Sequence, residues 1–128
     1  MARADTVPRL VELARLGFAD LDRATDGVLE LAGLVGLHPG ELLERFDAQT
    51  GDPDDAVVCL LRLARRARDR TTVALLDPQW GVRLVRVAGA STGLIEFLTR
   101  HPEQLDALRR PIPALPDRAA RSAARTYP

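Results

Sequence analysis

Residues 52–68 read DPDDAVVCLLRLARRAR, and this stretch carries the clearest helix signal of the sequence. Asp52 before Pro53 is typical of a helix cap followed by the first helical turn. Asp54 and Asp55 place negative charge in that turn, where it interacts favourably with the helix dipole, and several arginines lie at the opposite end. The predicted buried stripe consists of Val57, Leu60, Leu61 and Ala64, and the predicted exposed side of Arg62, Arg65, Arg66 and Arg68. The stretch therefore predicts an amphipathic helix with one face in a core.

Similar signals predict helices on both sides of this stretch. Asp20 is expected to cap a helix in which Gly27 and Gly33 mark either close packing or a break. The apolar stripe of that helix consists of Leu21, Ala24, Val28, Leu31, Ala32 and Val35. Asp77 before Pro78 repeats the cap-and-proline pattern and predicts a helix that continues over residues 79–88.

Ser91 follows Gly89 and Ala90 and is predicted to start a helix that cannot continue regularly past Pro102. Its predicted core face consists of Leu94, Phe97 and Leu98. Because truncated core side chains leave cavities, Leu94→Ala or Phe97→Ala is expected to cost about 2 to 5 kcal/mol of stability.

Shorter elements complete the prediction. A first helix is capped by Asp5 or Thr6, has Pro8 in its first turn, and ends at Gly17. Its apolar positions are Leu10, Leu13 and Ala14. A helix is expected from Pro39 through Glu41, Glu44 and Phe46 to near Thr50 and Gly51. A short turn is expected from Thr71 or Thr72 through Val73, Ala74, Leu75 and Leu76. A last short helix contains Leu105 and Leu108.

The composition favours an all-α fold. Alanine, leucine and arginine fill 58 of the 128 positions, and all three have high helix propensity. We expect a single helical domain of about six to eight short helices over residues 1–110. Residues 111–128 contain prolines at 111, 113 and 116 and are otherwise rich in alanine and arginine, so we expect a disordered linker or a truncated tail.

The charge balance argues against a nucleic-acid partner. The chain has 18 basic and 18 acidic side chains, so its net charge is zero and it has no overall cationic field. Its single cysteine, Cys59, rules out an internal disulfide. Neither a signal peptide nor the roughly 18 consecutive apolar residues of a membrane span is recognised, so we expect a cytoplasmic protein without a membrane partner.

Two Asp-x-Asp pairs are the candidate metal ligands, because paired carboxylates supply hard oxygen ligands. They are Asp20 with Asp22 and Asp52 with Asp54. Both pairs lie at predicted helix starts, where the dipole alone favours acidic side chains. We interpret them as caps and predict no metal-ligating residue.

The other candidate residues also favour structural interpretations. Ser91, His101 and Asp106 include the residue types of a nucleophilic triad, but Ser91 occupies a predicted cap. His38 and His101 each precede a proline and are interpreted as residues that terminate or join helices, with bonds to backbone carbonyls. The basic patch of Arg62, Arg65, Arg66, Arg68 and Arg70 is interpreted as a solvated face, Cys59 as a small core residue and Trp80 as a packing anchor. No catalytic or cofactor-binding residue is predicted.

Two motifs resemble a known family. Residues 83–103 read RLVRVAGASTGLIEFLTRHPE, and residues 16–20 read LGFAD and are followed by Arg23 and Ala24. The first motif is carried by Gly89, Ser91, Leu94, Phe97, Leu98, Arg100, His101, Pro102 and Glu103. It resembles the N-terminal helical region of bacterial glutamine synthetase adenylyltransferases, also called adenylyl-removing enzymes, and the second resembles the corresponding region of actinobacterial members. The resemblance covers residues 7–110.

That resemblance implies a role but no active site in this chain. Members of the family transfer an adenylyl group from ATP to a tyrosine of glutamine synthetase and remove it by phosphorolysis. They use magnesium and two nucleotidyltransferase domains of Gly-Ser…Asp-x-Asp type. Here Gly89-Ala90-Ser91 is not followed by Asp-x-Asp. We therefore expect residues 1–110 to be the helical lead-in to a nucleotidyltransferase domain outside this chain, and the chain alone to be inactive and to bind neither ATP nor Mg²⁺.

Two other functions remain open at this point. A stand-alone helical adaptor or regulator would bind a protein partner through exposed apolar grooves or through the basic patch. A helix-turn-helix DNA-binding protein is disfavoured by the zero net charge.

Overall fold

The structure is a computed structural model, and it describes residues 8–109. In that range the elements are α2 (Leu10–Arg15), α3 (Leu21–Val35), α4 (Pro39–Leu43), α5 (Pro53–Arg66), α6 (Arg68–Leu76), α7 (Pro78–Ala90), α8 (Thr92–Arg100) and the 3₁₀ helix η1 (Pro102–Arg109). No strand occurs between residues 8 and 109. The predicted all-α fold is confirmed. The predicted caps Asp5 and Thr6 and the predicted linker over residues 111–128 lie outside the described residues.

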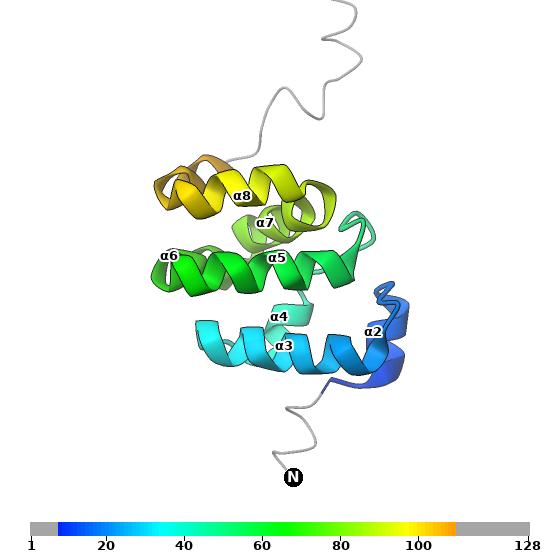
Figure 1. The fold of residues 1–128 in the computed structure, drawn as a ribbon. Coiled ribbons are helices and arrows are strands. Elements are labelled where there is room, and N and C mark those ends of the chain that lie inside the picture. Colours follow the sequence, from blue (N-terminus) through cyan, green and yellow to red (C-terminus); the bar gives the residue numbers. More distant parts are fainter. Residues whose placement is uncertain (1–7, 110–128) are drawn as a thin grey trace, which may run out of the picture.

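Helix α5 is the centre of the fold (Figure 1). It packs between α3 and α8, and α7 covers it from behind. The ion pairs Glu30–Arg65 and Arg62–Glu96 link the later parts of α3, α5 and α8. Hydrogen bonds link their first residues, so the three helices run parallel and form one layer with a common N-terminal edge.

Local capping signals explain where the helices begin. Asp20 and Asp52 each accept a hydrogen bond from the backbone amide three residues later, at 3.1 Å in both cases. Ser91 accepts from the amide of Leu94 at 3.1 Å in the same way. Asp77 accepts from the amides at positions 79 and 80, which begins α7 at Pro78. All four predicted caps are therefore confirmed.

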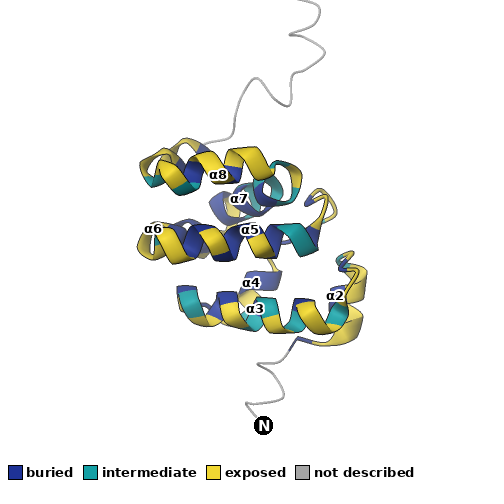
Figure 2. Ribbon diagram, in the orientation of Figure 1, coloured by how far each residue is buried: buried dark blue, intermediate teal, exposed yellow. Residues whose placement is uncertain are grey.

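The helices enclose one core, and the burial pattern is visible in Figure 2. The four side chains of the stripe predicted for α5 are all buried, namely Val57, Leu60, Leu61 and Ala64. Trp80 is 3% exposed, and its indole Nε1 donates to the carbonyl of Leu105 at 3.1 Å. The guanidinium of Arg109 lies 5.2 Å from the centre of the indole ring. Trp80 therefore anchors η1 to α7, as its interpretation as a packing anchor predicts.

Helix α4 is shorter than predicted. It ends at Leu43, so Glu44 and Phe46 lie outside it. Phe46 leaves the helix to pack against Phe18, with the ring centres 5.6 Å apart. Arg45 turns inward, and its Nε donates to the carbonyl of Leu75 at 2.8 Å. Tertiary packing therefore overrides the local helix signal here.

Other predicted boundaries are also corrected. Helix α2 begins at Leu10, so Pro8 lies before its first turn. The segment containing Thr71 is part of a nine-residue helix, α6, instead of a short turn, and Arg68 begins this helix. The buried Thr71 hydroxyl donates to the carbonyl of Ala67 at 2.8 Å, which satisfies it inside a helix.

The two glycines of α3 have different environments. A Cβ on Gly27 would lie 2.8 Å from a methyl group of Val57, so this glycine marks close packing, as predicted. Gly33 has no atom within 4 Å of the corresponding position, and α3 is continuous through it. Gly33 therefore marks neither close packing nor a break, which corrects the prediction.

The predicted core face of α8 is wrong in two of its three positions. Ile95 and Leu98 are buried, whereas Leu94 is 40% and Phe97 is 45% exposed. The apolar run is wide enough to support two neighbouring stripes, and packing against α5 and α7 selects the one centred on Ile95. The large cavity cost expected for Leu94→Ala and Phe97→Ala therefore no longer follows. None of the described helices is long and apolar enough to cross a membrane.

Candidate interaction surface

The acidic residues at the N-terminal edge hold the parallel helices together. Asp54 accepts a hydrogen bond from the backbone amide of Ala19 at 2.7 Å, which joins the start of α5 to the start of α3. Asp55 accepts from the hydroxyl of Thr92 at 3.2 Å, which joins α5 to α8. In each predicted Asp-x-Asp pair the first residue, Asp20 or Asp52, is a helix cap. These carboxylates are therefore engaged in structural hydrogen bonds.

A groove of about 650 Å³ runs between α3 and α5 at this edge. Its apolar surface comes from Phe18, Ala19, Ala24, Gly27, Val57, Val58 and Leu61, and its charged residues are Asp20, Arg23, Asp26, Glu30, Asp52, Asp54 and Asp55. In the part of the chain that the structure describes, no group of three His, Cys, Asp or Glu residues is arranged to hold a metal ion. The groove is an acidic cleft over an apolar floor.

Arginines gather at the opposite edge. Arg65, Arg66, Arg68 and Arg70 line a shallow depression together with Pro102. Arg65 pairs with Glu30, and Arg62 lies 3.8 Å from Glu96. The side chains of both pairs are about half exposed, so solvent weakens their attraction. The basic patch is thus a hydrated face with ion pairs between helices, and the absence of a nucleic-acid partner stays a prediction.

The three residue types of a triad are not brought together around α8. Ser91 caps the start of this helix and His101 follows its end. A helix of nine residues is about 14 Å long, so the two side chains are too far apart to exchange a proton. Asp106 is exposed on η1. The arrangement supplies no nucleophile and base pair.

The two histidines lie between helices, as predicted. Their side chains make other contacts than the predicted bonds to backbone carbonyls. Nδ1 of His38 accepts a hydrogen bond from the amide of Gly40 at 3.0 Å and so caps α4. His101 lies at the C-terminal cap of α8. Its ring lies 4.8 Å from the ring of Phe97, and its Nδ1 lies 3.7 Å from Glu103.

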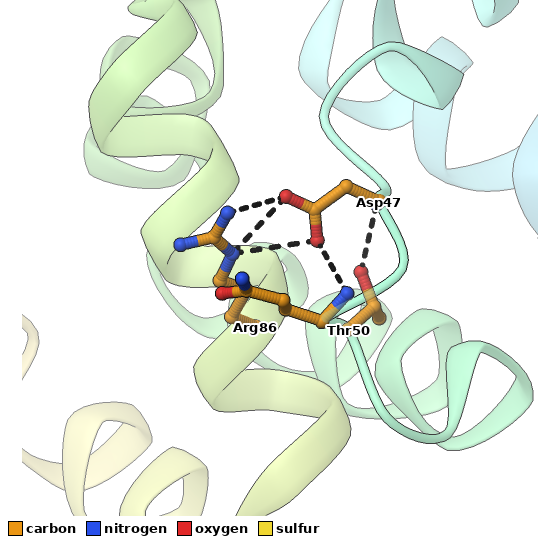
Figure 3. A network of polar contacts seen from close by, with 4 residues as sticks. Asp47, Thr50 and Arg86 are labelled. Carbon is orange, nitrogen blue, oxygen red and sulfur yellow. Dashed lines mark hydrogen bonds and ion pairs between the residues drawn. The ribbon is translucent and has the colours of Figure 1, made fainter.

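A polar network that the sequence did not predict fixes the loop before α5 (Figure 3). Arg86 on α7 contacts both carboxylate oxygens of Asp47, with Nε at 3.2 and 3.3 Å. The Thr50 hydroxyl lies 3.0 Å from the amide of Asp47, and the carboxylate also accepts from the amide of Gln49. The Arg86 guanidinium lowers the pKa of Asp47, and the carboxylate in turn raises the pKa of Arg86. The contact spans 39 residues of sequence, so no local pattern could have revealed it.

The glycine of the Gly-x-Ser motif permits a backbone contact at the same edge. A Cβ on Gly89 would lie 2.0 Å from the carbonyl oxygen of Thr50. The carbonyl of Gly89 accepts from the amide of Asp52 at 3.2 Å. The end of α7 therefore lies directly on the loop that starts α5, and the next motif residue, Ser91, caps α8. Gly89 and Ser91 thus have structural roles.

Cys59 is a core residue, as predicted. It is 1% exposed, and burial raises the pKa of its thiol, with the nearby Asp55 carboxylate adding to the effect. A buried protonated thiol is a poor nucleophile.

Side chains of the motif that are not used for packing gather on the outer side of α8. Leu94 and Phe97 are exposed large apolar residues, and the exposed His101 lies against Phe97. We call these three residues the α8 end face. Exposed apolar side chains that cluster in this way are typical of protein contact surfaces.

Comparisons with known proteins support the resemblance seen in the sequence. The chain is 43% identical over 110 residues to the bifunctional glutamine synthetase adenylyltransferase/adenylyl-removing enzyme of Leifsonia xyli subsp. xyli, which is 86% of this chain and 11% of that enzyme. The enzymes of the same name from Streptomyces avermitilis and Cutibacterium acnes are 36% and 32% identical over 112 and 105 residues. Those matches cover 83% and 80% of this chain and 11% of each enzyme. No family model and no solved structure matches the chain.

The chain therefore resembles one segment of these enzymes and spans about a tenth of the length of the curated relatives that it matches.

Proposed function

We propose that this chain is the helical, non-catalytic segment of a glutamine synthetase adenylyltransferase/adenylyl-removing enzyme, and that it packs against and positions a nucleotidyltransferase domain. The proposal rests on the match to the three enzymes. Between 80% and 86% of this chain aligns with 11% of each enzyme. The enzymes named in those matches act on glutamine synthetase, and we propose glutamine synthetase as the partner of the whole assembly.

The roles of the acidic residues support a non-catalytic segment. Transfer of an adenylyl group from ATP needs carboxylates that hold a metal ion on the phosphates. The carboxylates of Asp20 and Asp52 accept amide hydrogen bonds as caps, and that of Asp54 accepts from Ala19. We propose that ATP and Mg²⁺ bind to polypeptide outside this chain, and that the assembly acts in the cytoplasm.

A chimeric enzyme tests this proposal. In the Leifsonia xyli enzyme, the segment matched by this chain is replaced with the present sequence, and adenylyl transfer from ATP to glutamine synthetase is measured with Mg²⁺. We expect the chimera to keep a rate close to that of the parent enzyme, because the helical segment supplies position and not chemistry. The purified 128-residue chain is expected to transfer no adenylyl group.

Two controls make the result decisive. A chimera carrying Gly33→Ala, at a position with open space around it, should behave like the unaltered chimera. A chimera carrying Gly89→Val should lose activity together with its fold, because the added side chain collides with the backbone at Thr50. Adenylyl transfer by the isolated chain, or a folded chimera without activity, would contradict the proposal.

A stand-alone adaptor is the second candidate, and the exposed α8 end face is the observation that favours it. In that case the end face would bind a separate protein, and the chimera would be folded but inactive. The same experiment therefore separates the two functions.

A further inference from the structure

The three parallel helices share one register. Each of α3, α5 and α8 begins with a side chain that accepts from the amide three residues later, so positions can be compared by counting from the cap. On α3, the third, seventh and tenth positions after the cap are Arg23, Gly27 and Glu30. Gly27 lies against Val57 of α5, and Glu30 pairs with Arg65 of α5. Arg23 lines the groove between the two helices, so this side of α3 faces the next helix.

The same three positions on α5 face α8. They are Asp55, Cys59 and Arg62. Asp55 accepts from Thr92, whose hydroxyl also lies beside the Cys59 thiol, and Arg62 pairs with Glu96. In both α3 and α5, the third, seventh and tenth positions after the cap therefore lie on the side that packs against the next parallel helix.

On α8 these positions are Leu94, Leu98 and His101. Leu98 is buried. Leu94 is 40% exposed, and Phe97 on the same helix is 45% exposed. Helix α8 forms one end of the layer and α3 forms the other (Figure 1). Among the described residues, no further parallel helix lies beyond α8. Leu94 and His101 of the end face thus occupy positions at which α3 and α5 each contact the next helix, and the apolar side chain of Phe97 lies one residue before the seventh position.

We propose that the α8 end face receives a further amphipathic helix, parallel to α8, from the polypeptide that follows the matched segment in the longer relatives. This inference rests on the proposed function, because it takes the missing helix from the rest of the enzyme. Two observations select this occupant. The parallel helices α3, α5 and α8 follow one another in chain order, and the match covers only 11% of the first relative, so most of that polypeptide lies outside it.

The chemistry of the face specifies the partner. Leu94 and Phe97 need apolar side chains opposite them, because burying exposed apolar surface is what makes such a contact favourable. The ion pairs at the tenth position, Glu30–Arg65 and Arg62–Glu96, cross from each helix to its successor. At the end of α8, His101 and Glu103 offer the corresponding polar groups.

Substitutions in the chimeric enzyme test this inference. The double variant Leu94→Asp with Phe97→Asp places two charges on the end face. We expect it to lower adenylyl transfer by the chimera at least about tenfold, the change that corresponds to about 1.4 kcal/mol. The matched control is Val73→Asp with Leu76→Asp, whose side chains on α6 are 52% and 51% exposed. That control is expected to leave the rate unchanged.

The isolated 128-residue chain separates docking from folding. Because Leu94 and Phe97 are exposed, the double variant should keep the circular dichroism spectrum and the melting temperature of the unaltered chain. A large loss of stability in the isolated chain would show that the two side chains belong to its own core, and would overturn the inference.

The remaining outcomes identify where the inference fails. If the unaltered chimera is active and the double variant is equally active, the end face does not receive the helix, and the proposed function stands. An inactive unaltered chimera overturns both.

If the isolated chain is a dimer that the double variant dissociates, a second copy is the occupant. If removal of residues 110–128 speeds amide hydrogen exchange in α8, the chain covers this face itself. Either of the last two results overturns the inference.

Discussion

The two edges of the α3–α5–α8 layer are held together by different interactions. At the N-terminal edge, side chains cap the helices and carboxylates accept directional hydrogen bonds across helices, as Asp54 does from Ala19 at 2.7 Å. At the C-terminal edge, the links between helices are ion pairs such as Arg65 with Glu30, whose side chains are more than half exposed. The N-terminal edge is thus fixed by short-range geometry and the C-terminal edge by charges that solvent screens.

Charge explains why parallel helices tolerate this arrangement. Three helix dipoles that point the same way repel one another at both edges. Acidic residues in the first turns of α3 and α5, and arginines in the last turns of α5 and α8, offset part of that repulsion. A chain of zero net charge therefore has one acidic and one basic edge. We therefore expect substitutions at the N-terminal edge to cost much more stability than substitutions at the C-terminal edge.

The largest effect is expected for Gly89→Val at the N-terminal edge. The added Cβ would lie 2.0 Å from the carbonyl oxygen of Thr50, so backbone has to move. We expect a loss of about 3 kcal/mol or more in the free energy of unfolding, measured by urea titration. The control Gly33→Ala fills open space on α3 and should stabilise the chain by about 0.5 to 1 kcal/mol. Equal stability of the Gly89 variant and the unaltered chain would show that the contact with Thr50 does not exist.

The next effect is expected for the cap of α5. Asp52→Ala removes the acceptor for the amide of Asp55 and a negative charge at the helix start, so a cost of about 1 to 2 kcal/mol follows. Asp52→Asn keeps an acceptor at the cap and should restore most of that stability. If both variants lose the same stability in thermal melts, the charge, and not the hydrogen bond, is what matters at this edge.

Local rules therefore predict much of this edge from sequence. Asp20, Asp52 and Ser91 were predicted as caps because each accepts from an amide only three residues away. The buried stripe of α5 was predicted because helical periodicity determines which side chains share a face.

Contacts between distant residues could not be predicted in this way. Arg45 bonds a carbonyl 30 residues away, and Arg86 reaches Asp47 across 39 residues. The α8 end face was missed for a related reason. The run around Leu94 and Phe97 supports two apolar stripes, and only the position of α5 and α7 decides which one is buried.

A smaller, pH-dependent effect is expected for the Asp47–Arg86 pair near the N-terminal edge. The pKa of Asp47 is lowered in the folded chain, chiefly by the Arg86 guanidinium. Its stabilisation is therefore fully present above the unfolded pKa of about 3.9 and is lost as the pH falls through the lower folded value. Because solvent reaches both side chains, we expect Asp47→Asn to cost only about 1 kcal/mol at neutral pH.

Urea titrations of both chains between neutral and acidic pH check this. The difference between the unaltered chain and Asp47→Asn should shrink below about pH 4, since protonation removes the charge that the variant lacks. The exposed Asp106→Asn serves as the control and should show no such convergence. A difference that stays constant with pH would mean that the carboxylate charge does not contribute.

The smallest effect is expected at the C-terminal edge, where Arg65→Ala removes the ion pair with Glu30. Both side chains are more than half exposed, so the pair should contribute less than about 0.5 kcal/mol. A double-mutant cycle with Glu30→Gln isolates the pair from other contacts of the two residues. At 1 M salt, where charges are screened beyond about 3 Å, the coupling should disappear, whereas the cost of Asp52→Ala should persist because a hydrogen bond at 3.1 Å is lost. A coupling that survives high salt would show that both edges are held by the same kind of directional contact.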